Sequence, residues 1–476
     1  MGAENVKDNN GKKAVKSGFW YVISNVLIRA VGIITAPIYT RLLTTAETGY
    51  ANNFNNYVSI LSAVMGLCLI YSVGRAKLDF ADEFDEFMSS IQTLSSLFGI
   101  IVMAVMFFVC PESGMLQFER RVVLILFAYL ALYPSIDYMQ YKYRFEYKYR
   151  ENIAISVIIT VATVVLSIAL MLAMPAERGF AKILGTVIPS AAVALWCYIN
   201  LLRKGKTFIN KKYWSYALRI GLPMIPHGLA MLLLARIDTT MIAEICDYSD
   251  VGLYTSGYTI GSLLMFLTNA IGQAWLPWFN ERLYTKDYKA VREKNRLMML
   301  LGCVVTLGFI ACAPEAVKIL YAPGYWTSMY VVPPVALGTL CQYFYTNYVN
   351  VELFYKKTSL IAVNSVIAAV INFGLNAYFI PKYGFIAAAY TTLAGYFILM
   401  VLHFICTRFI LKHAIYDDAL YFVMLAITCV IGIAYIMVYE KWIIRYCISI
   451  LWFGALAYAR KRDIINAVKM LKNRRG

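Results

Sequence analysis

The sequence predicts an all-α integral membrane protein with about fourteen transmembrane helices. Of its 476 residues, 61% are hydrophobic and only 15% are charged, whereas an ordinary soluble domain is about 45–50% apolar and about 25% charged. Apolar segments of about 20 residues follow one another along the chain, each long enough to cross a hydrocarbon core of about 30 Å. The connections between them are short, which leaves no room for a soluble catalytic domain.

Fourteen apolar segments are predicted to span the bilayer. They cover residues 17–42, 49–73, 88–109, 120–138, 152–174, 179–202, 213–236, 251–275, 297–313, 328–351, 358–380, 384–407, 417–439 and 442–459. With the N-terminus placed inside, Lys and Arg show about a threefold excess in the cytoplasmic connections, as the positive-inside rule expects. The prediction is therefore a multi-pass protein of the bacterial plasma membrane with both termini in the cytoplasm.

An internal repeat predicts two related halves. The segment RLLTTAETGY (41–50) matches EICDYSDVGL (244–253), and RGF (178–180) matches YGF (383–385) at a nearly equal offset. Each repeat holds six spans, so both halves have the same orientation and their pseudo-twofold axis runs along the membrane normal. The predicted domains are a six-helix lobe (1–202), a second six-helix lobe (213–409), two extra helices (417–459) and a basic cytoplasmic tail (460–476).

Charged side chains in the predicted spans are candidates for substrate binding, because an ionisable group in the bilayer is costly. Arg29 lies near the centre of the first span, and Arg219 and His227 lie eight residues apart on the seventh, roughly on one face. By these boundaries no Asp or Glu lies in a span interior, which favours an anionic substrate, and guanidinium suits phosphate. The alternatives are bundle pairing for Arg29, snorkelling for Arg219 and a satisfied core position for His227.

Amide side chains in the spans indicate a second, uncharged layer of recognition. They occur in NNFNN (52–56), in QYFYTNYVN (342–350) and at Asn364, Asn372 and Asn376. Amides and tyrosine hydroxyls in a hydrated cavity suit sugar hydroxyls, and Asn52, Asn55 and Asn372 are the predicted substrate-binding members. For each amide the alternative is interhelical hydrogen bonding, worth about 0.6–2 kcal/mol.

Three prolines are predicted hinges. Pro37 lies in the first span, and Pro223 and Pro226 lie in the seventh, which is its equivalent in the repeat. Each removes a backbone hydrogen bond and favours a kink. Paired kinks suit an alternating-access transporter, although proline kinks are also common static features.

The stretch YKYRFEYKYR (141–150) alternates aromatic and charged residues between the fourth and fifth spans. We interpret it as an interfacial anchor, with tyrosines at headgroup level and cations against anionic lipid. Guidance of an anionic headgroup towards the pore is an alternative, whereas nucleic-acid binding is disfavoured because no folded cytoplasmic surface accompanies it. Its position between two helices favours helix over strand.

Metal and redox chemistry find no support in the sequence. Ten cysteines are scattered, mostly in apolar spans and without a C-x-x-C pair, and the three histidines do not cluster with them. A zinc site or a disulfide framework is therefore not expected. The sequence predicts no cofactor, no metal and no catalytic residue, and the protein is not expected to be an enzyme.

Three motifs resemble the polysaccharide-export branch of the multidrug/oligosaccharidyl-lipid/polysaccharide flippase superfamily, and more closely its Wzx-type O-antigen or teichoic-acid flippases. TAPIYTRLLTTAETGY (35–50) is similar to P-x-x-x-R-L-L-x-x-x-x-x-G. RIDTTMIAEICDYSDVGLYTSGYTI (236–260) with AWLPWF (274–279) is similar to D-x-x-x-I…VGLYS-x-A…AW-x-P, and IPKYGFIAAAYTTL (380–393) to P-x-x-G-x-x-G-A-A-x-x-T. Ala387 and Thr239 depart from the pattern, which weakens a subfamily assignment.

The resemblance implies two six-helix lobes around a central cavity and a polyprenyl-diphosphate-linked oligosaccharide as cargo. It implies movement from the cytoplasmic to the outer leaflet by alternating access, with Arg29 meeting the diphosphate. Coupling to a proton or sodium gradient and partnership with polysaccharide polymerase machinery are left open. The alternatives are a multidrug cation antiporter of the same superfamily, which the missing intramembrane carboxylate disfavours, and a membrane polymerase or glycosyltransferase, which the short loops disfavour.

Overall fold

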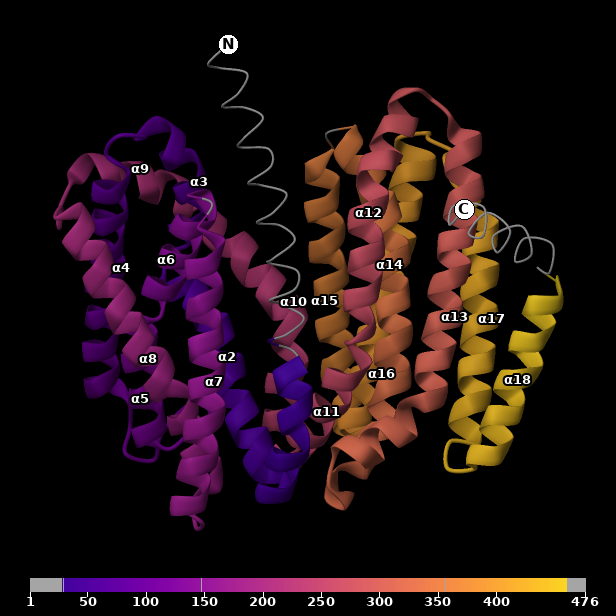
Figure 1. The fold of residues 1–476 in the computed structure, drawn as a ribbon, viewed down its shortest axis with the longest axis horizontal. Coiled ribbons are helices and arrows are strands. Elements are labelled where there is room, and N and C mark those ends of the chain that lie inside the picture. The colour runs from indigo at the N-terminus through magenta and orange to yellow at the C-terminus, as the bar shows by residue number, and fades with distance from the viewer. Residues whose placement is uncertain (1–27, 29, 147, 356, 460–476) are drawn as a thin grey trace, which may run out of the picture. The chain divides into compact units, whose positions relative to one another are not determined.

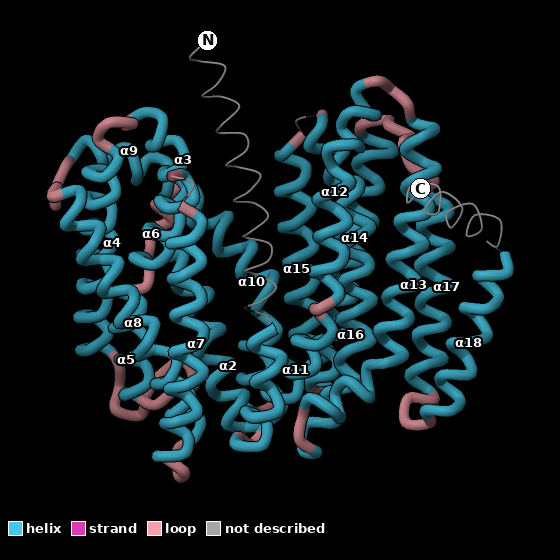
Figure 2. Tube along the Cα trace, viewed as in Figure 1, coloured by secondary structure: helices cyan, strands magenta, loops and turns pink. Residues whose placement is uncertain are grey.

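The computed structural model describes residues 28, 30–146, 148–355 and 357–459, and this part of the chain is helical without a β-strand (Figures 1 and 2). Each of the fourteen predicted spans is mostly helical over its described residues, with short turns within some of them, so the all-α prediction is confirmed. Within the described residues, eight helices are long and apolar enough to cross a membrane: Phe84–Val109, Arg120–Phe145, Tyr149–Ala173, Arg178–Gly205, Tyr288–Leu320, Ser359–Tyr383, Phe385–Ile410 and Asp418–Met437.

The chain divides into two compact units. The first comprises Met1–Leu253 and Leu320–Gly324, and the second comprises Tyr254–Ile319 and Tyr325–Gly476. The first unit extends beyond residue 213 because α10 (Met224–Ile245) packs against α2 (Thr45–Met65). The predicted lobes, 1–202 and 213–409, stay a prediction.

The first unit is built around two apolar clusters, one near Phe87 and Tyr138 and the other near Phe54 and Leu126. Its helices besides α2 and α10 are Ala30–Leu42, α3 (Ile70–Asp79), α4 (Phe84–Val109), α5 (Arg120–Leu132), α6 (Pro134–Phe145), α7 (Tyr149–Ala173), α8 (Arg178–Gly205), α9 (Lys211–Gly221) and the start of α11 (Tyr248–Gly261).

The second unit has one large core of aromatic and sulfur-containing side chains, with Phe279, Met299, Phe344 and Tyr421 at its centre. In it α14, α15 and α16 lie side by side (Figure 1). Its helices are the end of α11, α12 (Leu264–Tyr284), α13 (Tyr288–Leu320), η1 (Pro323–Val331), α14 (Val332–Phe354), α15 (Thr358–Tyr383), α16 (Phe385–Ile405), η2 (Cys406–Ile410), α17 (Asp418–Met437) and α18 (Trp442–Ala459).

The two segments of the sequence repeat have equivalent local structures. Thr44 caps α2 by accepting from Glu47 N at 3.2 Å, and Asp247, at the equivalent position, accepts from Asp250 N at 2.8 Å. Both are side-chain caps that satisfy an otherwise unpaired N–H at a helix start. The repeat therefore encodes the same helix start twice.

The equivalent glycines of the repeat let the two helix starts meet. A Cβ on Gly49 would lie 1.7 Å from Tyr248 O, and one on Gly252 would lie 2.0 Å from Thr45 O. Thr45 and Tyr248 are themselves equivalent in the repeat, so the contact is reciprocal. Only glycine permits this backbone approach.

The segment 141–150 is mostly helical where it is described, with a break at Glu146 and Lys148, but its predicted contacts are partly wrong. Helix α6 ends at Phe145 and α7 begins at Tyr149. Lys142 is 1% exposed and forms an ion pair with Asp85, and Tyr143 is also buried. Lys142 therefore ties α6 to α4 instead of meeting lipid, because the inward face of α6 carries it.

Candidate functional site

The predicted site residues are distributed over both units. Arg29 lies outside the described residues, so its contact with a diphosphate stays a prediction. Asn55 on α2 and Arg219 on α9 are exposed, Asn52 is half-buried, and Asn372 on α15 is buried. The side chains of His227 and Pro226 also lie outside the described residues, although both positions belong to α10.

The seventh predicted span is two helices. Helix α9 ends at Gly221 and α10 begins at Met224, with Pro223 immediately before it. Arg219 and His227 therefore belong to different helices, and the inference that they share a helical face does not apply. Pro37, in contrast, lies within the helix Ala30–Leu42. The hinge roles of the three prolines stay predictions.

A pocket of about 210 Å³, lined by both polar and apolar surface, lies between α12 and α14 in the second unit. Ten residues line it: Thr268, Asn269, Gly272, Trp275, Leu276, Gln342, Tyr343, Thr346, Asn347 and Asn350. None of these side chains carries a formal charge at neutral pH. The lining therefore offers hydroxyl, amide and apolar groups to a ligand.

Helical periodicity brings these residues together. Thr268, Gly272 and Trp275 are four and three residues apart on α12, and side chains at such spacing share one face of a helix. On α14, Tyr343, Thr346 and Asn350 follow the same rule. A Cβ on Gly272 would meet no atom within 4 Å. Because glycine has no side chain, open space remains beside α12 at this position.

Two buried polar atoms in this pocket have no hydrogen-bond partner among the described residues. They are Nε1 of Trp275, a donor, and Oε1 of Gln342, an acceptor. An unsatisfied buried polar group costs about 1–3 kcal/mol, so such atoms call for an explanation. A hydroxyl can both donate and accept a hydrogen bond, and the Trp275 ring adds an apolar surface to the pocket.

A hydrogen-bond network behind the pocket holds α14 in place. Asn347 Nδ2 donates to Tyr343 O at 3.0 Å, and Asn347 Oδ1 accepts from Asn295 Nδ2 on α13 at 3.2 Å. Tyr421 on α17 donates to Asn295 Oδ1 in turn. The α14 wall is thus fixed by side chains from two further helices, which pre-orients its amides.

Sequence reasoning found one wall of the pocket and missed the other. The sequence indicates the polar stretch 342–350 as a recognition surface, but it does not single out Thr268, Asn269 or Trp275. Their spacing on one helical face, within a predicted apolar span, is the signal that indicates them.

Two buried acidic residues lie just beyond the predicted span boundaries, in helices that extend further than the sequence indicated. Glu352 belongs to α14 and is 0% exposed, and Asp238 on α10 is also buried. The predicted tenth span ended at residue 351, one position before Glu352, and span boundaries are the least certain part of a sequence-based assignment.

The fold is that of known membrane transporters. The structure of the lipid II flippase MurJ in an inward closed conformation matches with a TM-score of 0.70 at 14% identity, covering 95% of this chain and all of MurJ. An inward-facing multidrug resistance MATE family transporter of the MOP superfamily matches with a TM-score of 0.55 at 15% identity, over 81% of this chain and 93% of that one. These likenesses define a multi-pass membrane protein with a transporter fold.

Sequence comparison supplies the family. The polysaccharide biosynthesis protein family matches residues 14–282, more than half of the chain. The chain belongs to this family. A Haemophilus influenzae protein of the Lsg locus is 25% identical over 215 residues, which cover 44% of this chain and 53% of that protein. The match thus spans about half the length of this relative.

Proposed function

We propose that the protein is a flippase that moves a polyprenyl-diphosphate-linked oligosaccharide from the cytoplasmic to the outer leaflet of the bacterial plasma membrane by alternating access. The observation that carries the proposal is the uncharged pocket between α12 and α14, with unpaired polar atoms on Trp275 and Gln342. Membership of a polysaccharide biosynthesis family makes a glycan the relevant ligand for such a pocket.

In this proposal the cargo divides between chemically distinct environments. The sugar enters the pocket, where hydroxyls exchange water for the amides of α14. The diphosphate meets Arg29, whose guanidinium presents paired donors to phosphate oxygens. The polyprenyl chain stays in lipid, because burying its apolar surface in an amide-lined cavity gains nothing. The product would serve cell-surface polysaccharide assembly, with polymerase machinery as a candidate partner.

The test compares two cargoes in liposomes that contain the purified protein. One is a fluorescent undecaprenyl-diphosphate-linked disaccharide, and the other is a lipophilic dye cation. We expect the disaccharide lipid to change leaflet and the dye to stay, because no lining residue of the pocket supplies a negative charge. Efflux of the dye without movement of the disaccharide lipid would replace this proposal with a multidrug cation antiporter.

Arg29→Ala and Arg29→Lys separate the role of the guanidinium from that of charge alone. If Arg29 binds the diphosphate, the Ala variant loses disaccharide-lipid transport at normal expression, and the Lys variant keeps part of it, because an ammonium cannot form the paired contact. Normal transport by the Ala variant would remove Arg29 from the mechanism.

A further inference from the structure

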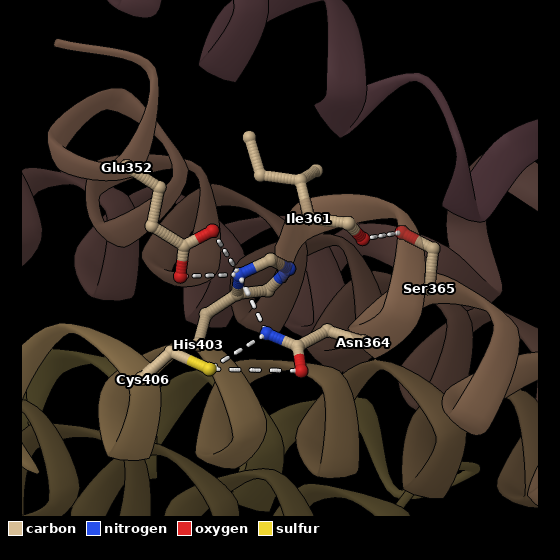
Figure 3. Close-up of polar contacts among 6 residues, drawn as sticks. All are labelled: Glu352, Ile361, Asn364, Ser365, His403 and Cys406. Atoms are coloured by element: carbon tan, nitrogen blue, oxygen red, sulfur yellow. Dashed lines mark hydrogen bonds and ion pairs between the residues drawn. The ribbon is translucent and has the colours of Figure 1, made fainter. Parts of the chain in front are cut away.

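An acid and an imidazole lie buried together in the second unit (Figure 3). Glu352 on α14 and His403 on α16 have relative exposures of 0% each, and His403 Nδ1 lies 3.0 Å from both carboxylate oxygens. Neither residue lines the pocket between α12 and α14. The pair is therefore a separate titratable site.

One side of the imidazole has no partner. Nδ1 also lies 3.4 Å from the Asn364 amide nitrogen, whereas Nε2 is buried and has no hydrogen-bond partner among the described residues. Figure 3 shows Nε2 on the side of the ring that faces away from Glu352. Tyr345 stacks on the ring with centroids 5.5 Å apart. The geometry fixes the imidazole while leaving one nitrogen available to gain or lose a proton.

Among the described residues, Glu352 forms an ion pair with no side chain other than His403. Arg408 on η2 lies 3.9 Å from Asp418 on α17, and Tyr348 on α14 donates to the same carboxylate at 2.9 Å. Cys406 contacts Asn364, and α15 has a single charged residue, Lys382, in its last turn. In the part of the chain that the structure describes, His403 is thus the side chain whose charge can compensate the buried carboxylate.

The net charge of the pair depends on one proton. With Glu352 ionised and His403 neutral, Nδ1–H donates to the carboxylate and the pair carries one uncompensated negative charge. A proton taken from water at Nε2 converts the imidazole to imidazolium and makes the pair neutral. Burial disfavours an uncompensated charge, whereas contact with water tolerates it. Proton occupancy therefore distinguishes a closed from a water-accessible state.

We propose that Glu352 and His403 form a proton-binding site that couples glycolipid movement to a proton gradient. This inference rests on the proposed function for its cargo. Helix α14 provides the link, because Asn350 lines the pocket two residues before Glu352. A π-helical turn, η2, follows α16 directly after the site, and such turns are frequent at functional positions.

The first experiment measures proton binding without cargo. The chain has only three histidines, so full-length protein labelled with ¹⁵N-histidine gives three sets of ring-nitrogen signals, assigned with His403→Gln and His413→Gln. We expect the His403 signal to record the uptake of one proton as the pH is lowered through the range of the titration. Glu352→Gln should shift the pH of that transition. His413→Gln should not, because His413 lies in a loop, where its ring stacks on Tyr355.

Two results of this titration would overturn proton binding by the pair. One is a His403 signal that keeps a single protonation state across the range. The other is a transition that Glu352→Gln leaves in place. If Glu352→Gln does not fold, Glu352→Asp shortens the contact side chain while keeping the charge, and it should move the transition as well.

The second experiment measures coupling. Liposomes that contain the protein and a pH-sensitive dye are given the undecaprenyl-diphosphate-linked disaccharide under an imposed pH gradient. We expect wild type and His413→Gln to move protons with the lipid, and Glu352→Gln and His403→Gln to lose proton movement and the pH dependence of transport. Retention of both by Glu352→Gln would overturn the coupling. A wild type that moves no disaccharide lipid would overturn the flippase function and its coupling, while the titration still decides proton binding.

Discussion

The amides of α14 and those of α15 lie in the same unit, but they differ in their hydrogen-bond partners. On α15, Asn376 Nδ2 donates to Asn372 Oδ1 at 3.3 Å, and Thr391 on α16 donates to Asn376 Oδ1. On α14, Gln342 lines the pocket, and its buried Oε1 accepts no hydrogen bond in the described structure. The α15 amides Asn372 and Asn376, whose partners are protein groups, are called the closed group. The α14 amides that line the pocket, with Gln342 among them, are called the open group.

This difference shows that residue type alone does not distinguish an amide that packs helices together from one that binds cargo. An amide whose partners are protein groups holds helices together, and an amide beside empty space with an unpaired atom is available to cargo. Each group therefore predicts a different phenotype: loss of stability for the closed group and loss of transport for the open one.

The largest effect is expected from Trp275→Ala. It removes both the unpaired Nε1 donor and the ring that borders the pocket, so disaccharide-lipid transport should fall more than tenfold, equivalent to at least about 1.4 kcal/mol of lost cargo interaction. Trp278→Ala is the matched control, because Trp278 lies one turn further along α12 and does not line the pocket. Equal losses in the two variants would show that the fall reflects packing.

Gln342→Met tests the open group with little change of shape. It removes the unpaired acceptor, so transport should fall about tenfold while thermal stability holds or rises, since an unsatisfied buried group is lost. Transport and melting temperature are measured on the same preparation. Unchanged transport would place the cargo elsewhere.

Asn372→Ala tests the closed group. It removes the acceptor of Asn376 in the interhelical network, which should cost about 1 kcal/mol of stability and leave transport by the folded protein close to wild type. Transport lost at an unchanged melting temperature would assign Asn372 a role in cargo binding, as the sequence predicted, and would break the comparison.

A surface ion pair serves as a reference for substitutions that affect neither group of amides. Arg121 donates to Glu177 at 2.9 and 3.0 Å, and these hydrogen bonds hold the pKa of the Glu177 carboxyl below its ordinary value. The pair's contribution to stability is present above that ordinary pKa and is lost as the pH falls through the lowered one. Because the pair is exposed, Glu177→Gln should lower the melting temperature only slightly and leave transport unchanged. A transport loss there would show that the assay responds to nonspecific damage.

Much of the fold follows from the sequence because apolar length and periodicity act locally. The helix caps at Thr44 and Asp247 are also visible in it, as a repeat. The pocket was only half predictable, since Trp275 and Gln342 lie far apart in sequence and meet through the packing of α12 on α14. The burial of Glu352 could not be predicted for the same kind of reason. The predicted span ends one residue before Glu352, and its partner, His403, lies on another helix.

The central claim is that the sugar of the cargo occupies the pocket between α12 and α14. The most direct measurement uses an undecaprenyl-diphosphate-linked disaccharide that carries a diazirine on its sugar, photolysed with the protein in liposomes and mapped by peptide mass spectrometry. The account predicts adducts on both walls, at residues 268–276 and 342–350, which Gln342→Met weakens and Asn372→Ala does not. Adducts confined to other helices, in protein that transports the probe, would contradict it.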